Sequence, residues 1–93
     1  MPFEWSETKR RRNILKHGID FVDAKELWAR HHIEYRSPQN HHDEERHIAV
    51  GELDDQIITI VFTWRGHARR LISARSARRY EKENYQNEIG RRS

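Results

Sequence analysis

The sequence predicts an α+β domain with N-terminal helices and a C-terminal helix packed on one face of an antiparallel sheet of about four strands. Two observations lead to this class. Cap signals and helical spacing of apolar residues dominate the first 30 positions, whereas strand-like alternation dominates residues 31–75. Helices and strands are therefore segregated along the chain, which is typical of α+β proteins. The predicted order of elements is β-α-α-β-β-β-β-α.

The N-terminal segment predicts a short strand and a first helix. The letters FEW, at residues 3–5, can form the strand. Ser6 is a suitable N-cap for a helix over residues 7–17, and Gly18 is its stop signal. This helix carries many cations, and it has only two obvious core residues: Ile14 and Leu15.

A second helix is predicted over residues 21–30, with Asp20 as its N-cap. Asp23 suits its first turn, because the N-terminus of a helix attracts negative charge. The apolar side chains of this segment fall on one face at helical spacing: Phe21, Ala24, Leu27 and Trp28. We therefore expect this helix to cover the sheet.

Four strands are predicted to follow, joined by short connections. Residues 56–64 are almost continuously β-branched or aromatic, as expected of a central strand. The dipeptides Asp54-Asp55 and Arg65-Gly66 provide turns on either side of it. Short connections favour antiparallel neighbours, so we expect a meander. The four predicted strands cover residues 31–37, 46–53, 56–64 and 67–75.

The last predicted element is a helix over about residues 76–89. Gly90 ends it, and residues 90–93 are expected to fray. One side of this helix carries loosely aligned apolar residues: Ala77, Tyr80, Tyr85 and Ile89. The 93 residues together are expected to form one domain over residues 1–93, because natural domains mostly contain about 100–150 residues.

Composition excludes several classes of protein. The chain contains no cysteine, which rules out disulfides, thiolate zinc sites and thiol catalysis. No stretch approaches the ~18–20 apolar residues of a membrane span, and the start of the chain lacks the apolar region of a secretion signal. We therefore expect a cytoplasmic protein that does not enter a membrane.

Charge is distributed unevenly along the chain. The net charge of +3 results from +2 over residues 1–20, −5 over residues 21–64 and +6 over residues 65–93. Two basic ends around an acidic middle suggest a polyanion on one face and a basic partner on another. The alternative is ordinary solvated surface charge.

Arginines gather around the predicted junction between the last strand and the last helix. Alternation along residues 57–65 places Thr63 and Arg65 on the face that becomes polar. A surface that combines Arg65, Arg70 or Arg75 with the helix start is a credible anion site, because helix N-termini and guanidinium groups both bind phosphate. In the alternative interpretation these arginines only pair with acidic residues such as Glu81.

No metal or cofactor site is predicted. The seven histidines include the adjacent pairs His31-His32 and His41-His42, but neighbours on a strand point to opposite faces. An enzyme would then depend on metal-free acid–base chemistry at a bound phosphate. RNA suits such chemistry, since its own 2′-OH can act as the nucleophile. His17, beside Lys16, is a candidate acid or base.

The order and spacing of several motifs resemble the BrnT ribonuclease toxins. The resemblance spans about residues 3–85, with Ser6 where the family often has Asp and with Trp64 in a less constrained position. It rests on the segments FEW…K…N…KHG…F…A, ER…G and T.R…RLISAR.A…E…Y, which comprise Phe3, Trp5, Lys9, Asn13, Lys16, His17, Gly18, Phe21, Ala24, Glu45, Arg46, Gly51, Thr63, Arg65, Arg70 to Arg75, Ala77, Glu81 and Tyr85.

The resemblance implies a RelE-like fold and an endoribonuclease that cleaves RNA, inhibits translation and is neutralised by a BrnA-like antitoxin encoded by the adjacent gene. Operator DNA would be bound only through that antitoxin. The predicted catalytic residues are Arg75, Arg65, His17, Lys16, Glu45 and Tyr85. The predicted RNA-binding residues are Arg70, Arg46, Lys9, Arg12 and Thr63. Glu81 is expected to orient an arginine, and Arg78 and Arg79 to be plain surface.

A different class of function stays open on the sequence alone. The basic patches and aromatic residues also fit a non-catalytic RNA- or DNA-binding module. Such a module would bind the backbone with a steep salt dependence and would not cleave it.

Overall fold

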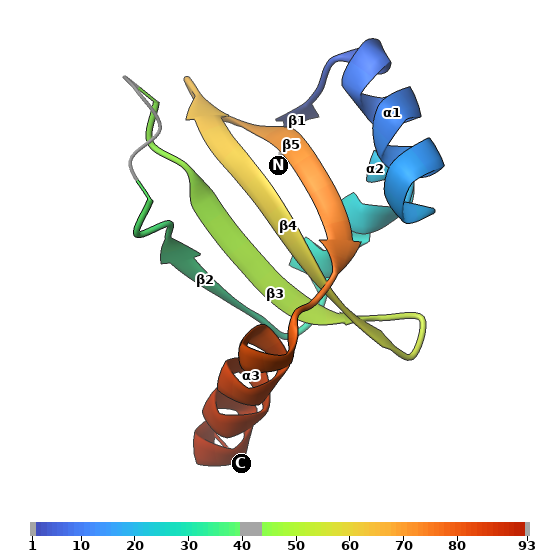
Figure 1. Cartoon of the computed structure of the whole chain (residues 1–93). Helices are drawn as coiled ribbons and strands as arrows, with labels where there is room; N and C mark the ends of the chain where they lie inside the picture. Colours follow the sequence, from blue (N-terminus) through green and yellow to red (C-terminus); the bar gives the residue numbers. More distant parts are fainter. Residues whose placement is uncertain (1, 40–43, 93) are drawn as a thin grey trace.

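The computed structural model describes residues 2–39 and 44–92 of the chain (Figure 1). Its nine elements follow the predicted order, with one addition, a 3₁₀ helix (η1) directly after α2. The elements are β1 (Phe3–Glu4), α1 (Glu7–His17), α2 (Phe21–Ala24), η1 (Lys25–Ala29), β2 (His32–Arg36), β3 (His47–Leu53), β4 (Gln56–Arg65), β5 (Ala68–Ser76) and α3 (Arg79–Arg92).

The sheet has five strands in the order β1-β5-β4-β3-β2. The meander from β2 to β5 is antiparallel, as predicted. The prediction of a wholly antiparallel sheet of about four strands is wrong, because β1 joins the edge of β5 in parallel, with Phe3 opposite Arg69. The Arg69 N–H extends this pairing by donating to the Pro2 carbonyl at 3.1 Å. A two-residue strand carries no periodicity from which its orientation could be predicted.

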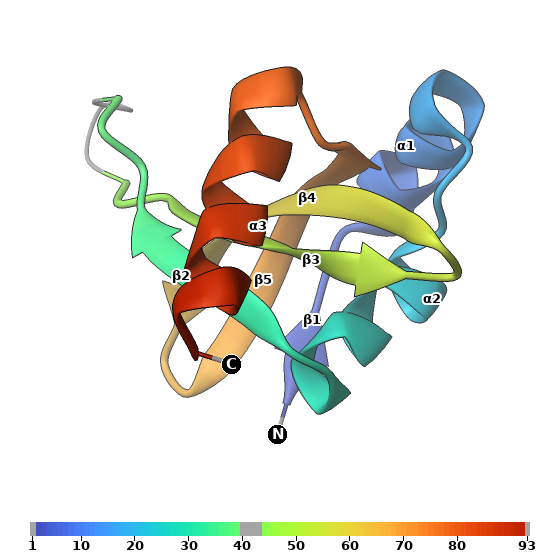
Figure 2. The ribbon, with the colours of Figure 1, turned by 90° about the horizontal axis from the view of Figure 1, so that it is seen from below.

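Helices cover both faces of the sheet, whereas the sequence predicted that they cover one. Segments α2 and η1 pack on the first face, and α3 packs on the second (Figure 2). The second face has its own smaller apolar cluster, to which α3 contributes Tyr85 and Ile89. Strand β4 is buried on both faces, which explains why its sequence is almost continuously apolar.

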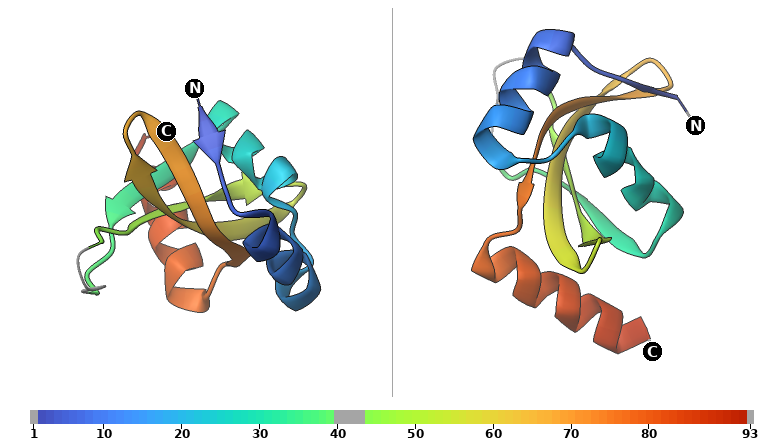
Figure 3. Two further views of the ribbon diagram at one scale, coloured as in Figure 1. Left: turned by 90° about the horizontal axis from the view of Figure 1, so that it is seen from above. Right: turned by 90° about the vertical axis from the view of Figure 1, so that its right-hand side faces the viewer.

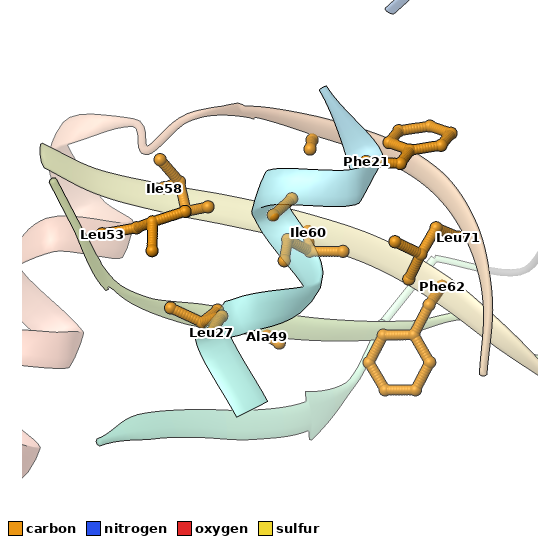
Figure 4. Packing of buried hydrophobic residues seen from close by; sticks show 10 residues of the cluster. Phe21, Leu27, Ala49, Leu53, Ile58, Ile60, Phe62 and Leu71 are labelled. Atoms are coloured by element: carbon orange, nitrogen blue, oxygen red, sulfur yellow. The ribbon is translucent and has the colours of Figure 1, made fainter. Parts of the chain in front are cut away.

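The main core lies between the sheet and the segment α2–η1 (Figure 4). Asp20 caps this segment as predicted, although the helix changes from α to 3₁₀ geometry after Ala24. Phe21, Ala24 and Leu27 are fully buried. Leu27 lies so close to Gly51 that a Cβ atom there would be 2.6 Å from its Cδ1, so only glycine fits at this point of β3.

Helix α1 has the predicted caps, but it does not bury the predicted residues. The Ser6 side chain accepts from the Lys9 N–H, and Gly18 adopts the left-handed conformation at the C-terminus. Leu15 is 88% exposed and Ile14 is 37% exposed. The buried residue is Asn13, because α1 packs along the edge of β5 beyond β1, where unpaired backbone groups need hydrogen bonds.

Asn13 replaces the missing neighbour strand at this edge. Its Oδ1 accepts from the Ala74 N–H at 3.0 Å, and its Nδ2 donates to the Ala74 carbonyl at 2.8 Å. The same Nδ2 also donates to the Ile19 carbonyl at 2.8 Å. The side chain thus satisfies both backbone groups of one strand residue and joins α1 to β5.

Helix α3 begins later and ends later than predicted. Strand β5 continues through Ser76, so the helix starts at Arg79. It then runs past Gly90 to Arg92, whereas the sequence placed its end at Gly90. A helical glycine costs only about 1 kcal/mol, and the i,i+3 ion pair between Glu88 and Arg91 supports the last turn.

A β-bulge interrupts the regular alternation of β5. Phe62 is opposite Leu71 and Val61 is opposite Ser73, which leaves Ile72 as an extra residue. Regular alternation along β5 would place Leu71 on the same face as Arg75, and the bulge prevents this. Leu71 faces the main core with Ala74, and Arg75 faces the side that carries α3.

Candidate active site

A polar cleft of about 250 Å³ opens on the face of the sheet that carries α3. Strand residues Ile48 and Val61 line it together with the first turn of α3 and the segment 37–39. Three cations converge on it from β5, from the start of β3 and from the residue before α3: Arg75, Arg46 and Arg78. Tyr80 and Glu81 complete the polar lining.

Glu81 holds Arg75 in a bidentate ion pair. Arg75 Nη1 donates to Glu81 Oε1 at 2.7 Å, and Nη2 donates to Oε2 at 3.0 Å. The Arg78 N–H and the Thr59 hydroxyl also donate to Oε1, at 2.7 and 3.0 Å. The Glu81 side chain is 1% exposed and that of Arg75 is 17% exposed, so solvent reaches only the arginine.

The charges of this pair are stabilised by their surroundings. Burial alone would raise the pKa of Glu81, but the hydrogen bonds from Arg75, the Arg78 N–H and Thr59, with the positive charge of Arg75, hold it below the usual value. The pKa of Arg75 is raised, chiefly by its hydrogen bonds to Glu81. Both groups stay ionised, and the guanidinium keeps one orientation toward the cleft. Glu81 thus orients an arginine in the structure.

Two tyrosines lie within electrostatic reach of Arg75. Tyr80 is 55% exposed on the first turn of α3, and Tyr35 of β2 is half-buried. Burial, followed by the charges of Glu81 and Tyr80, raises the pKa of Tyr35. The sequence did not predict Tyr35 or Tyr80 near this site, and the expectation that Arg78 is plain surface is wrong, because Arg78 lines the cleft. Only the positions of Tyr80 and Arg78, directly after the arginine motif, could have indicated that these two residues belong to the site.

The loop before β3 brings one predicted RNA-binding residue to the cleft. Arg46 lines the cleft and pairs with Glu44 at 3.1 Å. Thr63 anchors this loop, because its hydroxyl donates to the Glu45 carbonyl at 2.8 Å. The Glu45 side chain lies outside the cleft lining and pairs with Arg36 at 3.0 Å.

Arg65 and Arg70 share a sheet face with Arg75 but lie farther along it. Arg75 is opposite Thr59, whereas Arg70 is opposite Thr63, about 13 Å farther along β4. Arg65 ends β4, about 20 Å from Thr59. The Arg70 side chain also pairs with Glu4 at 3.3 Å. The three arginines therefore form a row rather than one cluster.

His17 and Lys16 lie at the C-terminal end of α1. Burial, then the charges of Lys16 and Arg75, lowers the pKa of His17 below its usual value. His17 is thus neutral at pH 7 and within electrostatic reach of Arg75, although it does not line the cleft. Lys9, Arg12 and Lys16 are exposed at helical spacing along one stripe of α1.

Tyr85 lies away from the cleft lining, in the smaller apolar cluster under α3. It is 7% exposed and packs with Ile33, Val50 and Ala77. Burial, followed by the charge of Glu52, raises its pKa, and a hydrogen bond with the Glu52 backbone opposes that rise. Its position indicates a core residue.

The structure gathers no metal-ligand set in the part of the chain that it describes. Within residues 2–39 and 44–92, no three His, Asp or Glu side chains come together as the ligands of an ion would. His31 and His32 are described, whereas His41 and His42 lie outside the described residues. No helix in the described ranges is long and apolar enough to cross a membrane.

Comparison with known proteins identifies the family. Residues 5–81 match the model of the ribonuclease toxin BrnT of type II toxin–antitoxin systems. The chain belongs to the BrnT family. It is also similar to the 1.1 Å crystal structure of the Brucella abortus ribonuclease toxin BrnT, at 34% identity and a TM-score of 0.64. The similarity covers 85% of this chain and 99% of the other. No curated protein matches the chain significantly.

Membership of the BrnT family decides between the two classes of function. The protein is a ribonuclease toxin of a type II toxin–antitoxin system, as the motifs predicted, rather than a non-catalytic binding module. RNA is accordingly its substrate and an antitoxin is its partner. The α+β fold, with helices on a five-stranded mixed sheet, matches that of the Brucella abortus BrnT toxin.

Proposed function

We propose that the cleft around Arg75 is the site at which RNA is cleaved, without a metal ion. The observation that carries this proposal is the bidentate pair between Arg75 and Glu81, which directs a fixed guanidinium into the cleft. A preorganised cation at a phosphate stabilises the charge that develops in the transition state. Arg46 and Arg78 add positive charge at the same place.

The proposed reaction is attack by the RNA's own 2′-OH on the adjacent phosphorus. The O2′–P bond forms, the P–O5′ bond breaks, and the proton lost by the 2′-OH is balanced by one gained at O5′. Neutral His17 near Arg75 can accept a proton, and the Tyr80 hydroxyl at the cleft can donate one. Neither step requires a cofactor.

The remaining basic residues extend the proposed RNA-binding surface. Arg75, Arg70 and Arg65 follow one sheet face over about 20 Å, and Arg46 lines the cleft beside them, so these arginines can contact phosphates along a single strand. The exposed stripe of Lys9, Arg12 and Lys16 on α1 can contact others. Glu45 and Tyr85 receive no catalytic role in this proposal, because Glu45 pairs with Arg36 outside the cleft and Tyr85 is buried in the apolar cluster under α3.

The cellular context completes the proposal. Cleavage of RNA in the cytoplasm would inhibit translation, and a BrnA-like antitoxin encoded by the adjacent gene would neutralise the toxin. The complex would bind operator DNA through the antitoxin only. We also propose that the fold is RelE-like.

Substitution of Arg75 tests the site. Arg75→Lys keeps a positive charge beside Glu81 but removes the bidentate contact, and we expect at least about tenfold slower cleavage of a single-stranded RNA. Arg75→Ala should lower the rate by about 10²–10³-fold and relieve growth inhibition. Arg79→Lys is the matched control, because that side chain is 94% exposed and pairs with Glu83. Unchanged cleavage by both Arg75 variants, with wild-type circular dichroism, would overturn the proposal.

A further inference from the structure

Helix α1 packs its polar side on the domain and leaves aliphatic side chains on its outer side. Its inner side is polar: Asn13 is buried, and Arg10 pairs with Asp20 at 2.8 Å. Its two large aliphatic side chains are turned outward, with Leu15 88% exposed and Ile14 37% exposed. A surface helix ordinarily buries its aliphatic side and exposes its polar one. This arrangement therefore indicates that something else covers the outer side.

The outer side of α1 is both apolar and strongly basic. Helical spacing places Arg11 one turn before Leu15, and Arg12 on the adjoining stripe. No carboxylate in the described ranges pairs with either arginine. We call Arg11, Ile14 and Leu15 the outer face of α1, and Arg12 borders it on the stripe of cations assigned to RNA. Figure 3 shows that α1 lies at the periphery of the domain, beside β5.

The chemistry of the outer face selects one kind of occupant. RNA is bound through cations and aromatic stacking, and the centre of this face is an aliphatic side chain. A second copy of the chain packed α1 against α1 would bring Arg11 and Arg12 against their own copies, which costs free energy. A protein segment that carries carboxylates around an apolar recess can pair with the charges of Arg11 and Arg12 and bury the Leu15 side chain.

We propose that the antitoxin docks on the outer face of α1 through an acidic segment that encloses Leu15. The cleft lining contains no residue of the outer face, and His17, the α1 residue given a proton-transfer role, follows the buried Asn13 by one turn on the inner side, so the outer face is separate from the proposed cleavage site. The inference requires only that the toxin has an antitoxin, which the BrnT family provides. It holds wherever on the toxin RNA is cleaved.

Two charge-introducing substitutions test the surface. Leu15→Glu and Arg11→Glu place a carboxylate against an acidic partner, and both residues are exposed in the free toxin. We expect the dissociation constant for the cognate antitoxin to rise at least about 30-fold in each variant. Lys82→Glu, an exposed cation on α3, is the matched control and should leave that constant within about twofold.

A second measurement separates the surface from the cleavage site. Each purified free variant should cleave RNA at the wild-type rate, with wild-type circular dichroism, and should inhibit growth even when the antitoxin is co-expressed. An unchanged antitoxin affinity in both variants would overturn the proposal. So would slower RNA cleavage at unchanged antitoxin affinity, which would assign the face to RNA. A dimer of the free wild type that becomes a monomer in Leu15→Glu would assign it to a second copy. Should Leu15→Glu fail to fold, the neutral Leu15→Gln serves as the test, with a smaller rise expected.

Discussion

Arg69 and Arg75 lie six residues apart in β5, but different groups contact their guanidiniums: chiefly aromatic rings at Arg69 and a carboxylate at Arg75. Arg69 is 6% exposed, and its Cζ lies 4.5 Å from the ring centroid of Trp64, 5.0 Å from that of Trp28 and 5.5 Å from that of Phe62. Its ion pair with Glu34 is long, at 3.4 Å. Arg75 instead has a short bidentate pair with a fully buried carboxylate.

The difference shows how one residue type serves two purposes in one strand. Aromatic rings surround Arg69, so its charge is used inside the fold as a cation–π contact. Glu81 holds Arg75 from the protein side and leaves the cleft side open. We therefore expect substitution at Arg69 to affect stability alone, and substitution at Arg75 to affect stability and cleavage.

The largest effect is expected for Arg75→Met. The substitution removes the partner of buried Glu81, and breaking a buried pair in this way costs about 3–5 kcal/mol of the free energy of unfolding. Urea denaturation measures this loss, and cleavage per folded molecule should fall by about 10²–10³-fold. Retained cleavage in the folded fraction would show that Arg75 is not part of the active site.

Adding Glu81→Gln to Arg75→Met should separate the two roles of the pair. The double variant no longer buries an unpaired charge, and the amide oxygen that replaces the carboxylate can still accept from the Arg78 N–H. We expect urea denaturation to recover about half of the lost stability. Cleavage should stay as low as in Arg75→Met, and recovery of cleavage would show that the arginine acts only through the fold.

A smaller effect is expected for Arg69→Met. The flexible apolar side chain fills the space between the rings, but the cation–π contacts are lost, so the free energy of unfolding should fall by about 2 kcal/mol. Cleavage per folded molecule should equal that of the wild type. A specific loss of cleavage would contradict the division between the two arginines.

The smallest effect is expected in the dependence of stability on acidic pH. Because the pKa of Glu81 is lower in the folded state, its contribution to stability is present above the usual carboxyl pKa of about 4.3 and is lost as the pH falls below it. The wild type should therefore lose stability more steeply below pH 4 than the double variant does, by at most about 1.4 kcal/mol per pH unit. Urea midpoints measured from pH 6 to pH 3 test this, and parallel curves would contradict it.

Local signals predicted the elements well. The caps of α1 at Ser6 and Gly18 were predicted because single residues determine them, and β4 was predicted because it is buried on both faces. The role of Asn13 could not be predicted, since it depends on backbone groups 61 residues away. The parallel pairing of β1 and the outward position of Leu15 likewise depend on tertiary contacts.

The candidate site was predicted only in part. Arg75 and Arg46 line the cleft, and Glu81 orients Arg75, because the motif that contains Arg75 and Glu81 is local and dense in charge. Tyr35 comes from a distant strand, and only the folded sheet brings it near Arg75. Arg65 and Arg70 were predicted to cluster with Arg75, but the three arginines form a row. Alternation gives the face on which a residue lies but not its distance along the strand.

The extra residue Ile72 has a consequence for how this strand tolerates change. In a regular strand, residues six apart share a face, so without the bulge Arg69 and Arg75 would point the same way. Deleting Ile72 would instead leave a regular strand in which the two arginines, now five residues apart, still point to opposite faces. Position 72 is therefore the point in β5 at which the strand can lose one residue and keep each arginine on its own face, because the bulge is lost with that residue.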